Sequence, residues 1–250
     1  MSRYVALGSS MAAGPGIRPR APGSPRLAGR SARNYPHLVA DRLGLRLVDV
    51  TYSGATTAHV LTDRQHGAPP QVDALDGSES LVTVTIGGND VGYVPMLFAA
   101  GLPRLLHRVP VLGKRIGDLL DPWSRQRALD EVGSSLISVG QALRARAPRA
   151  TVLFVDYLTL LPEHPPLRDA DGRLARHISE TLERLTAEAA EATGCGLVRA
   201  AAASRDHHAW AQQPWTTRFG VPLPGRPAPL HPNAAGMRAV ADLVVATVTR

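Results

Sequence analysis

The sequence lacks features that would assign it to several classes of protein. Its 250 residues contain one cysteine, Cys195, so no internal disulfide can form. No apolar run approaches the roughly 18–20 residues of a membrane-spanning helix, and the first residues include no apolar segment of signal-peptide length. These absences predict a protein of a reducing compartment without a stable membrane span. We therefore expect a cytoplasmic location, and a secreted chain whose leader had been removed would look the same.

Lysine is almost absent, and one stretch has no acidic residue. Lys114 is the only lysine among 28 basic residues, against 21 acidic residues, for a formal net charge of +7. Residues 1–40 hold six arginines and no Asp or Glu. This stretch predicts either a solvated loop or a surface for anionic substrates or headgroups. No zinc-finger spacing and no motif of interleaved aromatic and basic residues occurs, so we expect no nucleic-acid partner.

Metal and cofactor motifs are also missing. His207 and His208 are adjacent, but no Cys or Asp follows at the spacing of a metal site. Gly14-Pro15-Gly16 fits neither the P-loop nor the dinucleotide-binding pattern. The sequence predicts no metal site and no cofactor.

What the sequence does contain is an alternation of short β-like runs and longer helical patterns. Strands are predicted over residues 4–7, 45–50, 80–86, 150–155 and 196–199, and helices over 35–43, 124–147, 172–193 and 233–248. Strands separated by helices indicate βαβ units, hence a parallel sheet with helices on both faces. We expect one α/β domain over residues 1–250.

Two segments lie outside this alternation. Residues 15–33 are rich in Pro, Gly and Arg and predict a loop. Residues 95–122 are apolar and follow the third strand closely, which predicts one or two short inserted helices. Such an insertion either adds core packing or forms a lid or acyl-binding wall, because catalytic loops lie at the carboxyl ends of parallel strands.

Four residues that could take part in catalysis stand next to the ends of predicted strands or the start of a predicted helix. Ser10 follows the first strand, Gly54 the second and Asn89 the third, while His231 precedes the last helix. A serine hydroxyl beside a histidine can act as a nucleophile. A glycine N–H and an asparagine amide are the donors that an oxyanion hole needs. Each motif alone is weak, since Gly-Ser-Ser and glycine turns are common.

Together the four motifs resemble the SGNH hydrolases, also called the GDSL lipase/esterase family. The family's Ser, Gly, Asn and His fall on Ser10, Gly54, Asn89 and His231. The lead-in to Ser10 and the stretch His-Pro-Asn-Ala-Ala-Gly look like actinobacterial-type members. The resemblance implies a flavodoxin-like three-layer α/β/α fold with a five-stranded parallel sheet. It also implies ester hydrolysis through an acyl-serine, with Ser10 as nucleophile and His231 as general base. Ser10, Gly54 and Asn89 would form the oxyanion hole.

The chain departs from the family pattern at two positions. The usual Gly-Asp-Ser is Gly8-Ser9-Ser10, and alignment favours Ser10 over Ser9 as nucleophile. The acid that normally stands three residues before the histidine is replaced by Ala228. We therefore predict a Ser-His dyad in which a main-chain carbonyl, of Ala228 or Pro229, orients His231. Asp206 is the alternative as a remote acid.

The substrate stays open at this level. The leading expectation is a serine esterase or lipase that acts on a small-molecule or lipid ester. The alternatives are a short-acyl carbohydrate deacetylase and a catalytically silent relative that binds an ester or lipid. The sequence predicts neither the oligomeric state nor whether the acyl group passes to water or to an alcohol.

Overall fold

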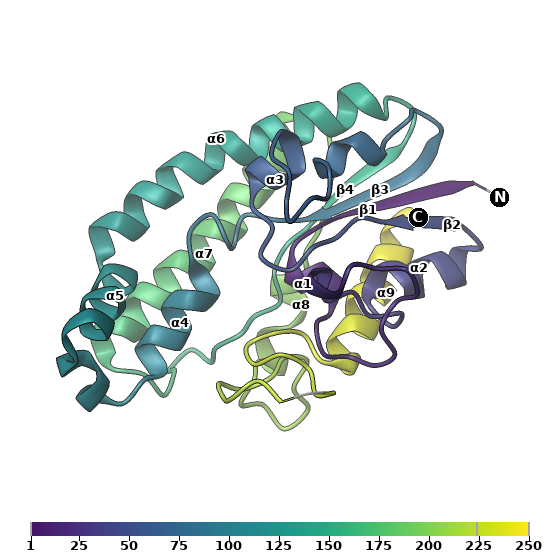
Figure 1. The fold of residues 1–250 in the computed structure, drawn as a ribbon. Helices are drawn as coiled ribbons and strands as arrows, with labels where there is room; N and C mark the ends of the chain where they lie inside the picture. Colours follow the sequence, from purple (N-terminus) through teal and green to yellow (C-terminus); the bar gives the residue numbers. More distant parts are fainter. Residues whose placement is uncertain (1, 224, 250) are drawn as a thin grey trace.

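The framework of the protein is a five-stranded parallel sheet. The computed structural model describes residues 2–223 and 225–249. Its strands are β1 (Arg3–Gly8), β2 (Arg46–Asp49), β3 (Glu79–Thr85), β4 (Thr151–Val155) and β5 (Gly196–Val198). They lie side by side in the order β2-β1-β3-β4-β5, all parallel. This is the flavodoxin-like order, and it confirms the predicted fold (Figure 1).

Helices cover both faces of the sheet. The α-helices are α1 (Ser10–Ala13), α2 (Tyr35–Leu43), α3 (Thr57–Leu61), α4 (Tyr93–Gly101), α5 (Pro110–Leu120), α6 (Pro122–Arg146), α7 (Asp169–Ala192), α8 (Ala200–Ala203) and α9 (Ala234–Val248). Short 3₁₀ helices are η1 (Arg26–Ala28), η2 (Gln71–Ala74), η3 (Arg104–Arg108) and η4 (Arg205–His207). Helices α2 and α9 pack together on one face, and α6 and α7 pack together on the other (Figure 1).

The first strand shows how the sequence builds these two layers. Tyr4 and Ala6 belong to the core beneath α2 and α9, while Val5 and Leu7 belong to the core beneath α6 and α7. Successive side chains of a strand point to opposite faces, so a run that is apolar at every position suits a strand covered on both sides. All four residues are fully buried.

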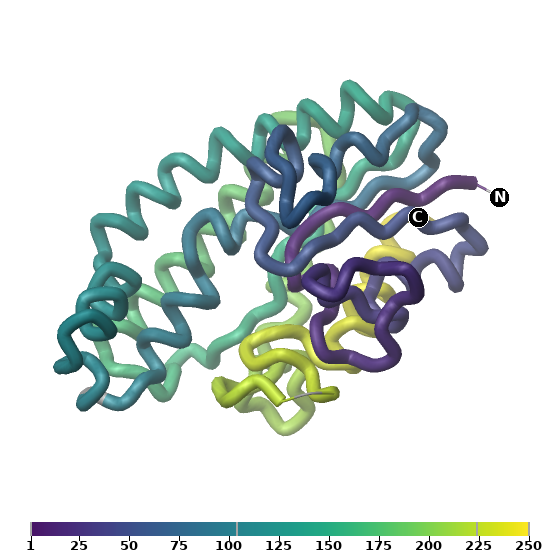
Figure 2. Tube along the Cα trace, viewed as in Figure 1, coloured from purple at the N-terminus to yellow at the C-terminus, as the bar shows by residue number. Residues whose placement is uncertain are grey.

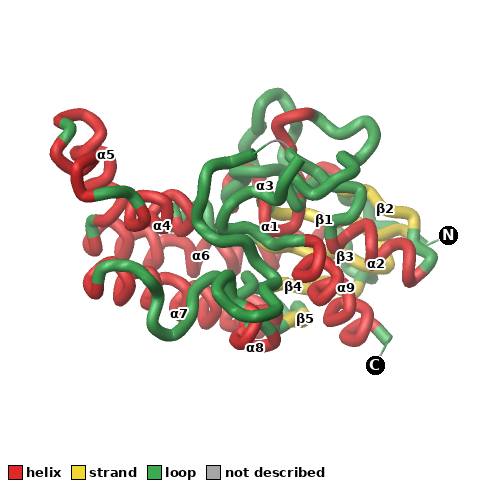
Figure 3. The backbone as a smooth tube through the Cα atoms, turned by 90° about the horizontal axis from the view of Figure 1, so that it is seen from below, coloured by secondary structure: helices red, strands yellow, loops and turns green. Residues whose placement is uncertain are grey.

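The chain brings distant segments together beside the carboxyl ends of the strands. The arginine-rich loop and the loop before α9 run alongside each other there (Figure 2), where Ala228 N donates to Pro15 O at 2.9 Å. Residues 93–120, which include most of the predicted insertion, form α4, η3 and α5. Helix α4 buries five of its residues, whereas α5 buries only Ile116 and projects from the body (Figure 3).

In the part of the chain that the structure describes, no helix is both long and apolar enough to cross a bilayer. The single-domain assignment for residues 1–250 and the lid role of residues 95–122 stay predictions.

Candidate active site

The turn after β1 presents two serines. Gly8 has a φ of 133°, and a Cβ at this position would lie 2.4 Å from Thr85 O of β3. Only glycine permits so close an approach. Ser9 N then donates to the same Thr85 O at 2.9 Å, which ends the strand, and α1 begins at Ser10. As the first residue of a helix, Ser10 has a backbone N–H without an intrahelical acceptor.

The two adjacent serines point to different partners. Ser10 Oγ lies 2.8 Å from His231 Nε2, although the residues are 221 positions apart. Ser9 Oγ lies 3.2 Å from the hydroxyl of Tyr157, just after β4. The structure therefore pairs the histidine with Ser10 and not with Ser9.

The other ring nitrogen of His231 faces a main-chain carbonyl. His231 Nδ1 lies 2.7 Å from Pro229 O. A carbonyl oxygen can only accept, so Nδ1 carries the proton and Nε2 presents a lone pair to Ser10. Of the two carbonyls predicted for this role, that of Ala228 accepts instead from Thr217 Oγ1 at 2.6 Å. Asp206 is exposed in η4 and has no hydrogen bond to His231.

The local backbone explains how Pro229 reaches the ring. Leu230 adopts a left-handed conformation with φ of 58°, uncommon for a residue other than glycine. Its side chain is buried in the core, which holds the turn in place. Thr217 secures the other side, because His231 N donates to Thr217 Oγ1 at 3.2 Å and Thr217 N donates to His231 O at 2.9 Å. Sequence reasoning missed Thr217, since nothing near it marks a motif.

Burial sets the protonation state of His231. It lowers the pKa of the imidazole below its usual value of 6.5, and the hydrogen bond to the Pro229 carbonyl offsets this in part. Removing a charged ring from water is unfavourable, so the neutral form is favoured. The ring is therefore neutral near pH 7 and able to accept a proton.

Gly54 and Asn89 follow β2 and β3, the two strands that flank β1, and their loops are joined. Asn89 Nδ2 donates to Ala55 O at 2.8 Å, which ties the loop after β3 to the residue next to Gly54. An amide NH₂ has two donors, and the structure gives one of them a partner among the described residues. Gly54 has a φ of 79° in an exposed turn. Asp90 adds a second tie by accepting from Thr57 Oγ1 at 2.5 Å and Thr57 N at 3.0 Å.

Tyr157 joins three strand ends beneath the site. Its hydroxyl accepts from Gly88 N at 2.9 Å, in the loop after β3, and lies 3.2 Å from Ser9 Oγ, after β1. Burial raises the pKa of Tyr157 to about 12, so the hydroxyl keeps its proton. No sequence motif marks this residue, because its role depends on the order of the strands.

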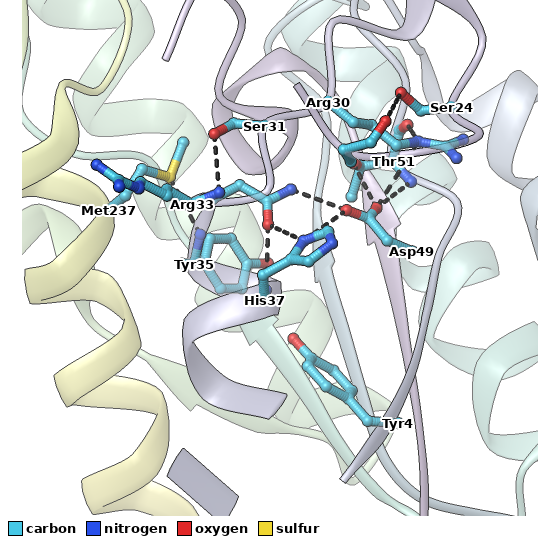
Figure 4. Close-up of polar contacts among 12 residues, drawn as sticks. Tyr4, Ser24, Arg30, Ser31, Arg33, Tyr35, His37, Asp49, Thr51 and Met237 are labelled. Carbon is cyan, nitrogen blue, oxygen red and sulfur yellow. Dashed lines mark hydrogen bonds and ion pairs between the residues drawn. The ribbon is translucent and has the colours of Figure 1, made fainter. Parts of the chain in front are cut away.

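The arginine-rich loop is held against the site by a polar cluster at the end of β2 (Figure 4). Arg30 Nε donates to Thr51 O at 2.5 Å, and Thr51 N and Oγ1 both donate to Asp49 Oδ1. Asn34 Nδ2 donates to the other Asp49 oxygen at 2.8 Å. Ser53 N, beside Gly54, donates to Ala28 O of the same loop at 3.0 Å. Arg30 thus serves the structure and is not a solvated charge.

Among residues 2–223 and 225–249, no three His, Cys, Asp or Glu side chains gather in a way that could hold a metal ion. The site consists of hydroxyl, imidazole, amide and backbone groups. Those are the groups that acyl transfer through a serine requires.

Comparisons with known proteins show which family the chain is similar to. The model of the GDSL-like Lipase/Acylhydrolase family matches residues 6–239. Lipase 2 of Streptomyces coelicolor is 35% identical over 251 residues, covering 96% of this chain and 83% of the relative. Phospholipase A1 from Streptomyces albidoflavus has a TM-score of 0.79 at 25% identity, with 100% and 99% of the two chains covered.

A second solved structure shares the fold. The extracellular lipase of Streptomyces rimosus has a TM-score of 0.76 at 24% identity, and both chains are covered completely. The family model spans nearly the whole chain, and a relative above 30% identity covers most of it. The chain therefore belongs to the GDSL-like lipase/acylhydrolase family and is a carboxylic ester hydrolase.

Proposed function

We propose that this protein hydrolyses lipid esters through an acyl-serine intermediate, with a Ser10–His231 dyad and no acidic third member. The observation that carries the proposal is the continuous line of contacts from Ser10 Oγ to His231 Nε2 at 2.8 Å and from His231 Nδ1 to Pro229 O at 2.7 Å. A nucleophile beside a base, which a third group orients, is the usual arrangement for nucleophilic catalysis.

In the proposed reaction, Ser10 Oγ attacks the acyl carbonyl carbon and His231 Nε2 takes its proton. The carbonyl oxygen becomes an oxyanion, which the N–H groups of Ser10 and Gly54 and the Asn89 amide would bind. His231 then returns the proton to the leaving alcohol as the carbon–oxygen bond breaks. Water deprotonated by His231 attacks the acyl-serine, and the acid leaves as Ser10 regains its proton.

The Pro229 carbonyl supplies one function of the carboxylate in a catalytic triad, which is to fix the tautomer of the histidine. It keeps the proton on Nδ1, so the lone pair of Nε2 faces Ser10, and the wrong tautomer in a serine protease costs about 10,000-fold in kcat. It carries no full negative charge, so it stabilises the imidazolium less than a carboxylate would. We expect a functional enzyme that is slower than one with a complete triad.

The proposed substrate is an ester with an acyl chain of some length. The names of its relatives, Lipase 2 and phospholipase A1, support a lipid substrate. The apolar helix α4 also supports it, because Phe98 of this helix packs against Phe219, with ring centroids 5.2 Å apart. Phe219 lies two residues from Thr217, which holds the histidine loop. Apolar side chains thus lie close to the catalytic loop.

A series of p-nitrophenyl esters from acetate to palmitate tests the proposal. Wild type is expected to prefer chains longer than acetate, and Ser10→Ala and His231→Ala to lose at least about 1,000-fold of kcat/KM. Asp206→Ala is the matched control and should keep wild-type activity.

If the rate of hydrolysis is highest with acetate and is lost by octanoate, the protein is a short-acyl carbohydrate deacetylase and not a lipase. The same background rate in all variants would leave a protein that binds its ester without turning it over. Loss of activity in Asp206→Ala would contradict the dyad.

A further inference from the structure

Exposed apolar side chains are concentrated in two segments of the surface. Among the described residues, nine large apolar side chains are exposed, and all but Leu27 lie in residues 105–123 or 219–223. The eight are Leu105, Val109, Val111, Leu112, Trp123, Phe219, Val221 and Leu223. Trp123 is 81% exposed and Val221 79%. Soluble proteins rarely expose contiguous apolar patches, and those that exist usually mark a binding surface.

Helix α4 connects the two segments, since it contacts α5 and also contacts Phe219 of the second segment. Helix α5 projects as an arm from the body beside α4 (Figure 3), and α4 contacts the second segment through the Phe98–Phe219 pair. The second segment follows Thr217, whose backbone and hydroxyl hold His231. A partner seated on both segments would therefore lie next to the catalytic histidine loop.

Positive charge accompanies the apolar residues. Residues 91–117 include four basic residues and no Asp or Glu, and residues 207–241 include three arginines and again no acid. Arg108 and Arg115 are exposed and have no acidic partner within 4.0 Å among the described residues. Lys114 is paired with Asp118 at 3.1 Å. The surface therefore joins apolar side chains to unpaired cations.

An apolar surface of this kind could contact either a second copy of the chain or a lipid surface, and the positive charge favours the lipid. A second copy of the chain would bring Arg108 and Arg115 of both copies close together, on a protein whose net charge is already +7. A surface of anionic lipids offers negative headgroups to the arginines and an acyl boundary to the apolar side chains.

We propose that the eight apolar residues, together with Arg108 and Arg115, dock the enzyme on an anionic lipid surface. We call this set the docking surface. The inference rests on the proposed lipid-ester function, because it states where that enzyme would meet its substrate. Docking would hold the lipid beside the loop that carries His231, because the second segment follows Thr217 directly.

Vesicle binding tests the docking surface without any chemistry. The full-length Ser10→Ala protein is mixed with vesicles of phosphatidylglycerol and phosphatidylcholine, and with vesicles of phosphatidylcholine alone, and is then sedimented. Anionic vesicles should bind more protein, and the binding should weaken as salt is raised. The emission of Trp123 should shift to shorter wavelength on binding, and the shift should disappear in Trp123→Phe.

Matched variants locate the surface. Leu105→Gln, Val111→Gln and Val221→Gln together should weaken binding to anionic vesicles by roughly tenfold or more. Leu27→Gln, at the remaining exposed apolar residue, should leave it unchanged. Arg108→Gln with Arg115→Gln should also weaken binding, whereas Arg46→Gln with Arg149→Gln, at the amino ends of β2 and β4, should do so much less.

Three results would overturn the proposal: equal binding of the triple variant and wild type, equal binding to neutral and anionic vesicles, or a dimer that the triple substitution abolishes while vesicles stay unbound. The proposed function is tested separately, on a dissolved ester with Ser10 intact. With Ser10 intact, the triple substitution should lower the hydrolysis of lipid in vesicles more than it lowers the hydrolysis of a dissolved short-chain ester. A wild type inactive on every ester, yet bound to vesicles, would contradict the function and leave the docking intact.

Discussion

At the scale of single residues, the site depends on one backbone conformation. The left-handed conformation of Leu230, with φ of 58°, turns the Pro229 carbonyl back toward His231. The sequence predicted that a carbonyl of this segment would orient the ring, because the expected acid is replaced by Ala228. It left open which carbonyl, since that depends on a dihedral angle and on the contact between Thr217 and Ala228 O.

The protonation of His231 gives a prediction for pH. The ring must be neutral to accept the serine proton, and burial lowers its pKa below 6.5. Lowering the pH through that pKa protonates the ring, so kcat/KM should fall with a midpoint below pH 6.5. The profile is measured on a dissolved ester by titrating the released acid. A midpoint at or above 6.5 would show that the imidazole is more solvated than the structure has it.

Thr217 is a positioning residue whose removal should affect turnover. Thr217→Val keeps the volume but loses the hydroxyl that bonds His231 N at 3.2 Å and Ala228 O at 2.6 Å. A displaced ring lowers kcat, by about 10- to 100-fold if it moves by a fraction of an ångström to one ångström. KM should stay nearly unchanged, and Thr217→Ser should restore most of the rate. A lowered melting temperature with an unchanged kcat would show a merely structural role.

At the scale of elements, the sequence predicted the strands and the long helices well and the short helices poorly. Helix α2 covers the predicted residues 35–43, because Asn34 caps its start and Gly44 adopts the left-handed conformation that ends it. Helices α3 and α8, of five and four residues, were not predicted. One turn of helix carries too little periodicity to be recognised.

The inserted segment shows a second limit at this scale. Residues 95–122 are rich in apolar residues along their length, yet α4 enters the core and α5 does not. The difference arises because α5 projects beyond the body of the molecule, where no other layer covers it (Figure 3). Composition alone therefore could not separate the core helix from the exposed arm.

The end of β4 carries a buried acid that should couple stability to pH. Asp156 Oδ1 accepts from Ala201 N at 2.8 Å, and Oδ2 has no partner among the described residues. Burial raises the pKa of Asp156 to about 7, against partial lowering by the bond from Ala201. The folded state thus holds the proton more tightly than the unfolded state, and this contribution to stability is lost as the pH rises through about 7.

Asp156→Asn should therefore be more stable than wild type above pH 7, where the wild-type carboxylate is charged in a buried place. The gap in unfolding free energy should widen between pH 5 and pH 8 by up to about 3 kcal/mol. Urea unfolding of both proteins at the two pH values measures it. The exposed Asp206→Asn is the control and should leave the curve unchanged. A gap that stays constant with pH would contradict a buried, protonated Asp156.

At the scale of the whole molecule, the alternation of strands and helices predicted a parallel sheet with helices on both faces, and the family resemblance implied the flavodoxin-like arrangement. A run buried on both faces is apolar throughout, and the order β2-β1-β3-β4-β5 then follows the doubly wound pattern. The charge of residues 1–40 was harder to interpret, because Arg3 binds Glu79 and Arg30 binds Thr51 inside the structure. Sequence counts cannot tell a charge that braces a loop from one that faces solvent.

The fold also explains why a site can be assembled from the two ends of the chain. Strand β1 lies inside the sheet between β2 and β3, and α9 packs beside α2, so residue 10 and residue 231 meet at one edge of the sheet. The four motifs were recognisable in the sequence because each stands at a strand end or a helix start. Thr217 and Tyr157 were not, since each acts only through residues far away in the chain.

The most direct test of the account is covalent trapping of the nucleophile. A fluorophosphonate ester is incubated with wild type, Ser9→Ala, Ser10→Ala and His231→Ala, and the modified residue is located by fragmentation mass spectrometry. We predict modification of Ser10 in wild type and Ser9→Ala, none in Ser10→Ala, and a loss of at least about 1,000-fold in labelling rate in His231→Ala. Modification of Ser9, or rapid labelling without His231, would contradict the Ser10–His231 dyad.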